Sequence, residues 1–430
     1  MIKRFLTVFL TVITATVMVA QRTSSSPYSF FGIGEDISRA TIEQASMGGI
    51  GVALKDYNHL NFVNPAANAD LRYATYGIGG ELSLLNEKSN TSNESGNTTS
   101  LRYIALGFPI GKKAGFTAGL QPVSSVGYSL LSNTEDTDGT ILEAERFRGS
   151  GGTTRLFGGF GINVYKGLAI GFEAGFVFGN IENNILNQRR DVDLSTKYVK
   201  NSIVRGGQFK LGAQYKTKVK KELDLNVGLV FQLENTLNLT GSERLFTLEF
   251  SSSGFEIPKD ELYNRSLSGS LTNPVKTIFG AGIGKENKWF AGIDYEFQDA
   301  FDNQGNLVSG STYRFEPSNR LSLGGYYIPK INSISSYWDR VTYRAGLRFE
   351  DTGLLVDGTG TGNNFTSIKD FGINVGFGLP LPRQLSSVNL GFEYGQKGTI
   401  DNNLIKENYF NIRLSLSLNS VNWFKKRRID

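Results

Sequence analysis

The sequence contains no cysteine and a single histidine, His59, among its 430 residues. The absence of cysteine excludes a disulfide framework, a thiolate metal site, a cysteine nucleophile and the cysteine that anchors a lipoprotein. With one histidine and no thiolate, a transition-metal site is not expected. We therefore expect neither a metal nor a cofactor.

The motifs of common enzymes are also missing. A serine hydrolase would need His59 as its base, but this histidine precedes the first predicted strand. No Gly-x-Ser-x-Gly element occurs, and no Gly-x-Gly-x-x-Gly follows a strand and opens a helix. We interpret His59 as a hydrogen-bonding residue of the N-terminal segment and expect no catalytic activity.

Long hydrophobic runs are absent beyond the N-terminus, and neither sign of charge predominates. The apolar stretch from Phe5 to Val19 follows Lys3 and Arg4 and precedes Ala20, which predicts a secretory signal over residues 1–20. No other run approaches the roughly 18 apolar residues that a spanning helix needs. The 45 basic and 40 acidic residues give a net charge of +5, which is no footprint for nucleic acid.

What the chain does contain is 51 glycines, 12% aromatic residues and a regular alternation of apolar with small or polar residues. The clearest example is a stretch in which every second residue is apolar: Leu168, Ile170, Phe172, Ala174, Phe176 and Phe178. A period of two predicts extended strands with one apolar face. The mean hydropathy of −0.21 is low for a helical membrane protein but suits a barrel, whose alternate residues face the lumen.

The alternation recurs from about residue 72 to residue 418 in 14 segments. We expect strands over 72–85, 99–110, 114–131, 153–165, 168–180, 203–217, 223–237, 275–284, 288–298, 319–328, 340–350, 368–379, 387–396 and 406–418. An even number is typical of single-chain bacterial barrels. The sequence thus predicts an all-β fold, a 14-stranded antiparallel transmembrane β-barrel over residues 72–418, with a basic tail over residues 419–430.

The links between these segments alternate in length. Long polar links, interpreted as loops, include Asn86–Thr98, Ser132–Gly152 and Leu239–Asn273, whereas Gly111–Lys113 and Lys166–Gly167 are short. Long external loops and short periplasmic turns characterise barrels of the bacterial outer membrane. An even number of strands then places both termini in the periplasm, where the basic tail is either solvated or in contact with an acidic partner.

Charged residues fall on the strand face opposite the apolar one. A charge facing lipid would cost about 2 to 4 kcal/mol near the midplane, so these residues are expected to face the lumen: Glu173, Asp224, Asp294, Glu296, Arg344, Arg348, Glu393 and Arg413. They would either form ladders of ion pairs that brace the barrel and hold the N-terminal segment, or line a polar conduit for solute.

Residues 21–71 are too polar to span a membrane and too few to form a core of their own, so we expect them to pack on or inside the barrel. They contain the stretch Ala45-Ser-Met-Gly-Gly-Ile-Gly-Val-Ala53, with Gly48, Gly49 and Gly51, and then Asn64-Pro65-Ala66. Leu-Gly-Phe-Pro-Ile at 106–110 and Gly-Phe-Thr-Ala-Gly-Leu-Gln-Pro at 115–122 follow. Over residues 30–128 the chain resembles the FadL-type long-chain fatty-acid transporter family. The resemblance implies a 14-stranded barrel with an N-terminal hatch inside it.

The third predicted strand carries Pro122 and Ser124. Proline cannot donate a ladder hydrogen bond, and a closed barrel has no free edge to accommodate it, so a local break in pairing is expected. A simple β-bulge is one interpretation. The family resemblance implies the other, a kinked third strand that opens the wall sideways toward lipid.

The resemblance also implies a function, passive uptake of hydrophobic compounds such as long-chain fatty acids, with capture near the external loops and lateral exit at the strand break. Membrane lipid and a hydrophobic ligand are the expected partners. Six phenylalanines are candidate ligand contacts, with packing as the alternative for each: Phe30, Phe31, Phe62, Phe246, Phe250 and Phe255. Because a fold does not determine a function, a non-transporting structural or accessory subunit of an outer-membrane secretion or assembly complex is the second hypothesis, with outer-membrane proteins as partners.

Overall fold

The computed structural model describes residues 26–304, 312–381 and 386–420. Fourteen antiparallel strands form a closed barrel. They are β2 (Ala74–Lys88), β3 (Asn93–Ile110), β4 (Ala114–Glu135), β5 (Ile141–Tyr165), β6 (Leu168–Arg189), β7 (Ser195–Lys220), β8 (Leu223–Gln232), β11 (Lys276–Lys285), β12 (Trp289–Gln298), β15 (Ser318–Tyr327), β16 (Thr342–Val356), β17 (Thr366–Pro380), β18 (Ser387–Lys397) and β19 (Lys406–Ser420). The ring closes where β19 pairs with β2, from Lys406 opposite Lys88 to Ser420 opposite Ala74. The predicted fold class is therefore confirmed.

Further short elements accompany the barrel: η1 (Pro27–Phe30), β1 (Glu35–Asp36), α2 (Ile42–Ala45), η2 (Pro65–Asp70), β13 (Asp302–Gln304), β14 (Tyr313–Phe315), η3 (Trp338–Arg340) and η4 (Asp401–Asn403). None of the helices in the described ranges has the length and apolar character needed to cross a membrane. The predicted signal over residues 1–20 and the run Lys425–Arg428 lie outside the described residues, as do the two chain ends whose periplasmic location was predicted.

The prediction that the long links are loops is wrong. The segment 239–273 belongs to a hairpin of β9 (Asn235–Phe250) and β10 (Glu256–Asn273), and most of residues 86–98 and 132–152 extend β2 to β5. These stretches lie beyond the belt of outward-facing apolar residues. Polar residues occupy both strand faces there, so the alternation of apolar and polar residues is weak in the sequence. The predicted strand 223–237 is also interrupted, because β8 ends at Gln232 and β9 begins at Asn235.

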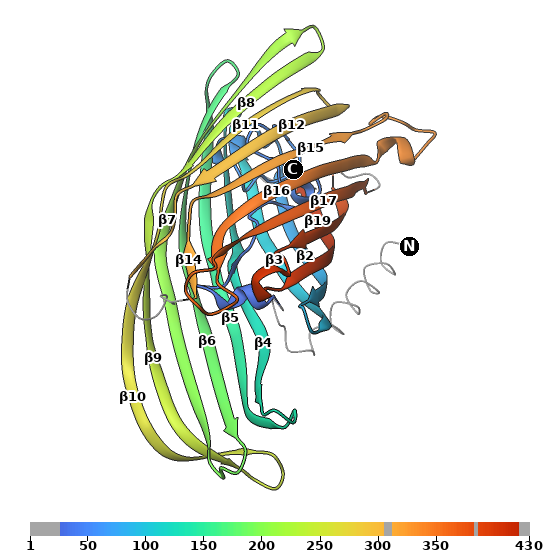
Figure 1. Ribbon diagram of the computed structural model, residues 1–430. Helices are drawn as coiled ribbons and strands as arrows, with labels where there is room; N and C mark the ends of the chain where they lie inside the picture. The colour runs from blue at the N-terminus through green and yellow to red at the C-terminus, as the bar shows by residue number, and fades with distance from the viewer. Residues whose placement is uncertain (1–25, 305–311, 382–385, 421–430) are drawn as a thin grey trace, which may run out of the picture.

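Part of the barrel wall is much taller than the rest. β4 to β7 contain 22, 25, 22 and 26 residues, whereas about 9 to 11 residues suffice to cross a bilayer. β9 pairs with the outer half of β7, and β10 pairs with β9. These six strands, β4, β5, β6, β7, β9 and β10, form one sheet that projects past the rest of the barrel (Figure 1), and we call it the projecting sheet.

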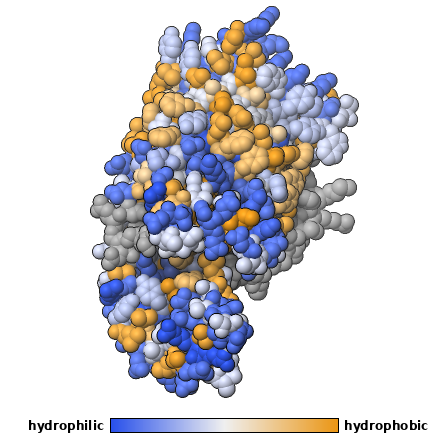
Figure 2. Space-filling view, viewed as in Figure 1, coloured by the Kyte–Doolittle hydropathy of each residue, from blue (hydrophilic) through white to orange (hydrophobic). Residues whose placement is uncertain are grey.

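The two faces of the barrel wall differ as expected. Phe172 and Phe176 are 43% and 49% exposed on the outside, whereas Glu173 between them is 5% exposed. Of the eight charged residues predicted to face the lumen, six are buried and the other two, Glu296 and Arg348, are half-buried. Hydrophobic residues gather over the barrel, whereas the tip of the projecting sheet is mostly hydrophilic (Figure 2). Alternation along each strand therefore separates a lipid-facing exterior from an ionic interior.

Residues 26–71, which we call the N-terminal segment, pass inside the ring of strands (Figure 1). At one end Ser26 Oγ donates to Glu407 in β19, and at the other Asn163 in β5 donates to the carbonyl of Ala69. Glu407 lies at the end of β19 that is remote from Ser420. The segment therefore begins at the rim that bears the projecting sheet and ends at the rim of short turns.

Candidate functional site

The barrel wall has an opening between β3 and β4. Their ladder runs from Ile110 opposite Ala114 to Ile104 opposite Leu120 and stops there. β4 continues to Glu135, paired on its other side with β5 as far as Ile141. β3 also extends past this point, where it pairs with β2 on its other side. The two strands thus separate above Leu120, at the end of the barrel that carries the projecting sheet.

The separation coincides with Pro122. The register between β4 and β5 shifts between Pro122 and Ser124, so Val123 has no partner on β5. Proline lacks the N–H that β3 would need for the next ladder bond. Both features occur where the sequence predicted a break in pairing.

The N-terminal segment takes the place of β3 along this free edge. β1 pairs with β4, with Glu35 opposite Ser125 and Asp36 opposite Ser124. The backbone N–H of Ile37 donates to the carbonyl of Val123 at 2.8 Å. Most of the buried edge is therefore satisfied from inside the barrel, whereas the outside of the opening stays accessible.

A pocket of about 440 Å³, which we call the lateral pocket, lies at this opening. Its apolar lining comes from Ile37 of the N-terminal segment, Leu101 of β3 and Pro122 of β4, and its polar lining includes Arg148 and Asn184. Leu101 could not be recognised as a site residue from the sequence, because nothing in the local pattern distinguishes it from other lipid-facing positions. Arg148 and Asn184 could not be recognised either, because they lie in the tall part of the wall, beyond the clearly alternating segments.

Beside the opening, the inner face of the wall carries an apolar cluster. Its buried members come from five strands: Val126, Tyr128, Val177, Ile181, Val204, Leu237, Leu239 and Leu271. Val126 and Tyr128 also line the lateral pocket. Ile33 of the N-terminal segment and Phe301 pack against the cluster. An apolar surface thus leads from the interior to the opening, under cover of the N-terminal segment.

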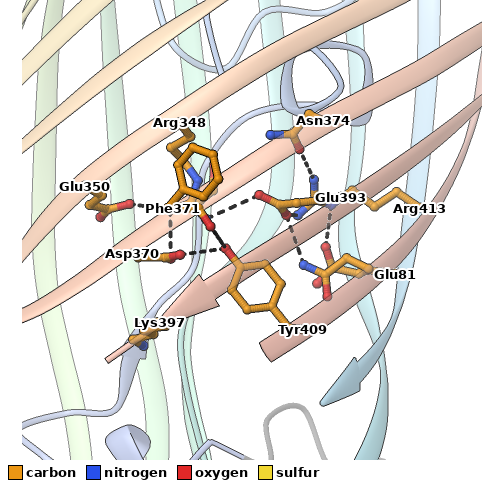
Figure 3. A network of polar contacts seen from close by, with 12 residues as sticks. Glu81, Arg348, Glu350, Asp370, Phe371, Asn374, Glu393, Lys397, Tyr409 and Arg413 are labelled. Carbon is orange, nitrogen blue, oxygen red and sulfur yellow. Dashed lines mark hydrogen bonds and ion pairs between the residues drawn. The ribbon is translucent and has the colours of Figure 1, made fainter. Parts of the chain in front are cut away.

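The lumen beneath this cluster is ionic. Arg348 contacts three carboxylates, Glu350 at 2.6 Å, Asp370 at 2.9 Å and Glu393 at 3.3 Å. Arg413 bridges Glu393 and Glu81, which continues the network to β2 (Figure 3). These residues line a cavity of about 310 Å³ between the wall and the N-terminal segment. The charges are thus paired across strands, which is the arrangement expected under the first of the two interpretations of the lumen charges.

Charged wall residues also hold the N-terminal segment in place. Lys397 of β18 pairs with Glu35 at 2.7 Å. Asp294 of β12 accepts hydrogen bonds from the backbone N–H groups of Gly51 at 2.7 Å and Val52 at 3.0 Å. The segment is therefore anchored to several strands by bonds to charged groups, which are among the stronger hydrogen bonds in proteins.

The glycine-rich stretch and Asn64-Pro65-Ala66 have structural explanations. Gly48 and Gly49 have φ values of +72° and +91°, which side chains with a Cβ rarely adopt. Asn64 caps η2, because its Oδ1 accepts from Ala66 N–H at 3.0 Å, and its Nδ2 donates to the carbonyl of Val52 at 2.8 Å. These residues determine the turn geometry and docking of the N-terminal segment.

The candidate phenylalanines do not form one pocket. Phe30 and Phe31 form a T-shaped, edge-to-face pair and contact Tyr128 and Tyr313, respectively. Phe62 is fully buried in the packing of the N-terminal segment. The remaining three lie in the β9–β10 hairpin: Phe246, buried; Phe250, half-buried; and Phe255, 73% exposed. The structure therefore separates them into three groups.

His59 forms a hydrogen-bonded chain with Asp56 and Ser387, with Nδ1 2.8 Å from Asp56 and Nε2 3.2 Å from Ser387 Oγ. The order matches the relay of serine hydrolases. Ser387 Oγ also accepts from Asn389, which in turn donates to Glu43 of α2. The chain thus links the N-terminal segment to β18, and we interpret it as an anchor.

Comparison with solved structures shows the same fold. The toluene transporter TodX of Pseudomonas putida aligns with a TM-score of 0.58 and 15% identity over 90% of this chain and 99% of its own. The toluene transporter TbuX of Ralstonia pickettii gives 0.58 and 12% over 89% and 99%. A FadL homologue of Pseudomonas aeruginosa gives 0.56 and 12% over 90% and 98%. At these identities the likeness is one of fold.

No curated protein matches the sequence significantly. One family model does match, and it covers residues 1–430, the whole chain; this family carries the description BamG. The resemblance to FadL-type transporters seen in the sequence is thus a resemblance of architecture. By the match over its full length, the chain belongs to the BamG family.

Proposed function

We propose that this barrel passes hydrophobic compounds, such as long-chain fatty acids, from the outer face into the bilayer through the opening between β3 and β4. The observation that carries the proposal is the end of the β3–β4 ladder at Ile104 and Leu120, with a pocket of about 440 Å³ at that point. The N-terminal segment acts as a hatch that covers the opening from inside.

The distribution of polarity supports a lateral route. A hydrophobic solute that crossed the lumen would have to pass the charged groups around Arg348 and Arg413. Its passage would cost free energy, because these groups would lose water and ion-pair partners. The apolar cluster around Val177 and Val204 offers a path above those charges. Leaving sideways at Pro122 delivers the solute directly to acyl chains.

The solved structures point in the same direction. Two of them are described as toluene transporters, and a third as a FadL homologue. They share the closed barrel with this chain, so the proposed route fits a fold that carries such activity in other proteins.

Because the chain has no cysteine, one introduced thiol can be labelled without interference. We would replace Ser100, which lines the lateral pocket on β3, by cysteine and attach a bulky maleimide. In cells that depend on this protein for uptake of labelled oleate or toluene, the label should reduce uptake severalfold. Lys112→Cys, in the exposed β3–β4 turn, is the matched control. Uptake that is unaffected by a fully labelled Ser100→Cys would contradict the lateral route.

A second candidate function is that of an accessory subunit in an outer-membrane complex. The observation that favours it is the projecting sheet, whose last strand, β10, has an open edge. Within the described residues, Glu256–Gly269 pair with β9 on one side and with no strand on the other. An open edge of this length is a template for a strand of another chain.

This second function is tested by a photo-crosslinking residue at Leu262, which is 56% exposed on β10. In native membranes it should capture a defined outer-membrane protein, whereas the same residue at lipid-facing Phe172 should not. A Leu262 variant that yields only uncrosslinked chain would count against a subunit role at this edge.

A further inference from the structure

Two arginines on the outer face of β5 have no partner for their charge in the part of the chain that the structure describes. Arg146 and Arg148 are exposed and flank Phe147, which points inward toward the apolar cluster. Among residues 26–304, 312–381 and 386–420, neither guanidinium takes part in an ion pair or a side-chain hydrogen bond. Both are therefore available to a ligand outside the barrel.

Arg148 lines the lateral pocket at one end, and apolar residues line it at the other. Along β4 and β5, Pro122 lies opposite Thr154, whereas Arg148 lies opposite Ser129. Thr154 lies six positions after Arg148 on the same strand, which corresponds to roughly 20 Å. The pocket is consequently elongated, with a basic end and an end bordered by Leu101 and Pro122.

The pocket lies at the boundary between the lipid-facing belt and the polar projecting sheet. On β6 the outward side chains of Phe176 and Phe178 are 49% and 39% exposed. The next two outward positions that line the pocket are Asn180 and Asn184. This is the depth at which a lipid in the outer leaflet would place its headgroup.

One acidic residue, Glu182, occupies the outward position between these two asparagines. Its carboxylate accepts a hydrogen bond from Asn184 at 2.7 Å. Arg146 and Arg148 together still leave an excess of one positive charge on this part of the surface. The excess favours an anionic group, and a guanidinium can bind a carboxylate or a phosphate through two parallel hydrogen bonds.

We propose that the lateral pocket binds an amphipath with an anionic headgroup, a carboxylate or a phosphate. Arg148 contacts the headgroup, and the positive charge of Arg146 adds electrostatic attraction. The acyl chain lies along Leu101 and Pro122 toward the bilayer. The inference rests on the proposed lateral passage and specifies its substrate class, an ionised amphipath in place of a neutral hydrocarbon.

The test measures equilibrium binding of oleate, oleyl alcohol and lipid A to the purified full chain in an uncharged detergent. Arg148→Gln should weaken binding of oleate about tenfold, the effect of losing one charged hydrogen-bond pair at a partly exposed site, and should leave oleyl alcohol unchanged. Arg205→Gln is the matched control, because Arg205 is exposed on β7 and does not line the pocket.

The lipid A arm distinguishes the source of the headgroup. Loss of lipid A binding in Arg148→Gln, without a change for oleate, supports the site and assigns it to phosphate. Equal effects of Arg148→Gln and Arg205→Gln, or equal weakening of oleate and oleyl alcohol, would overturn the site. The lateral route would survive that result if maleimide at Ser100→Cys still blocks uptake, so the two proposals fail separately.

Discussion

At the scale of single residues, several glycines of the barrel wall leave the space in which the N-terminal segment packs against the strands. A Cβ added to Gly171 of β6 would overlap the backbone of Pro65 and Ala66. At Gly175, four residues further along the same strand and on the same face, the atom nearest to an added Cβ is the carbonyl oxygen of Leu156 at 3.4 Å, an ordinary contact. The first position is closed to any side chain, and the second is not.

We therefore predict that Gly171→Ala destabilises docking of η2 by about 1 to 3 kcal/mol, the usual cost of overpacking. Hydrogen exchange of residues 64–70 measures the effect, and exchange there should accelerate. Gly175→Ala serves as the control and should leave exchange unchanged. Equal exchange in both variants would mean that η2 is not docked against β6.

Burial and partner charge act in opposite directions on Asp56 and His59. Burial alone would raise the pKa of Asp56, but the charge and hydrogen bond of His59 lower it to about 2. Burial alone would lower the pKa of His59, but the carboxylate of Asp56 raises it above the usual 6.5. The pair is therefore fully charged between about pH 4 and pH 6.5.

The sign of the pH dependence follows. The stabilising contribution of His59 is complete below pH 6.5 and is lost as the pH rises through its raised folded-state pKa. The contribution of Asp56 is present above about pH 4 and is lost as the pH falls toward 2. We expect the stability of wild type relative to His59→Gln to fall by at most about 1 kcal/mol from pH 6 to pH 9, because the pair is partly exposed. Thermal unfolding at both pH values checks this, and a difference that grows with pH would contradict it.

At the scale of elements, β16 to β19 are joined by the charges of the lumen as well as by their ladders. Arg348 on β16 pairs with Glu350, Asp370 and Glu393. Its removal would leave the half-buried Glu350 and Asp370 without this cation, whereas Glu393 would keep Arg413. We predict that Arg348→Leu costs about 3 to 5 kcal/mol, measured as a lower unfolding temperature in detergent.

The control for this prediction is Arg189→Leu. The side chain of Arg189 is 65% exposed and pairs with Glu143 in the projecting sheet, so its removal should leave the unfolding temperature almost unchanged. Comparable effects of the two substitutions would show that the lumen network does not brace the wall.

At the scale of the whole molecule, the barrel and the projecting hairpin are separable. β8 pairs directly with β11, from Gln232 opposite Lys276 to Asp224 opposite Gly284, so the ring closes without β9 and β10. Replacing Ser242–Ser266, which face each other in register, by a two-residue Asn-Gly turn should leave a folded barrel, visible as heat-modifiable mobility on a gel.

The same deletion discriminates between the two candidate functions. A transporter that uses the opening at Pro122 should keep its uptake, because the deleted residues do not line the lateral pocket. A subunit that docks through β10 should no longer co-purify with its partner from native membranes. Loss of uptake with retained co-purification of the partner would reverse the assignment.

Much of this architecture could be predicted from the sequence because alternation is a local property. Phe172 and Glu173 must face opposite sides of any strand, and only one of them tolerates lipid. The position of the break could also be predicted, since Pro122 cannot complete a ladder. The projecting sheet was missed because, beyond the membrane belt, both strand faces are polar and the period carries little contrast.

The residues of the candidate site could not be predicted in the same way. Phe30, Phe62 and Phe255 share a residue type but not a location, because their separation in space depends on where the N-terminal segment and the β9–β10 hairpin come to lie. Arg148 and Leu101 are 47 positions apart in the sequence, and only the parting of β3 from β4 brings them to one pocket.

The amino-acid sequence by itself determined the barrel, the sorting of charges from apolar side chains and the residue at which the wall parts, since each follows from the chemistry of one strand meeting water or lipid. The tertiary structure alone decided how far the wall parts, what covers the gap and which charges remain without a partner. These depend on register and on contacts between segments hundreds of residues apart, such as Glu35 with Lys397, which no local pattern records.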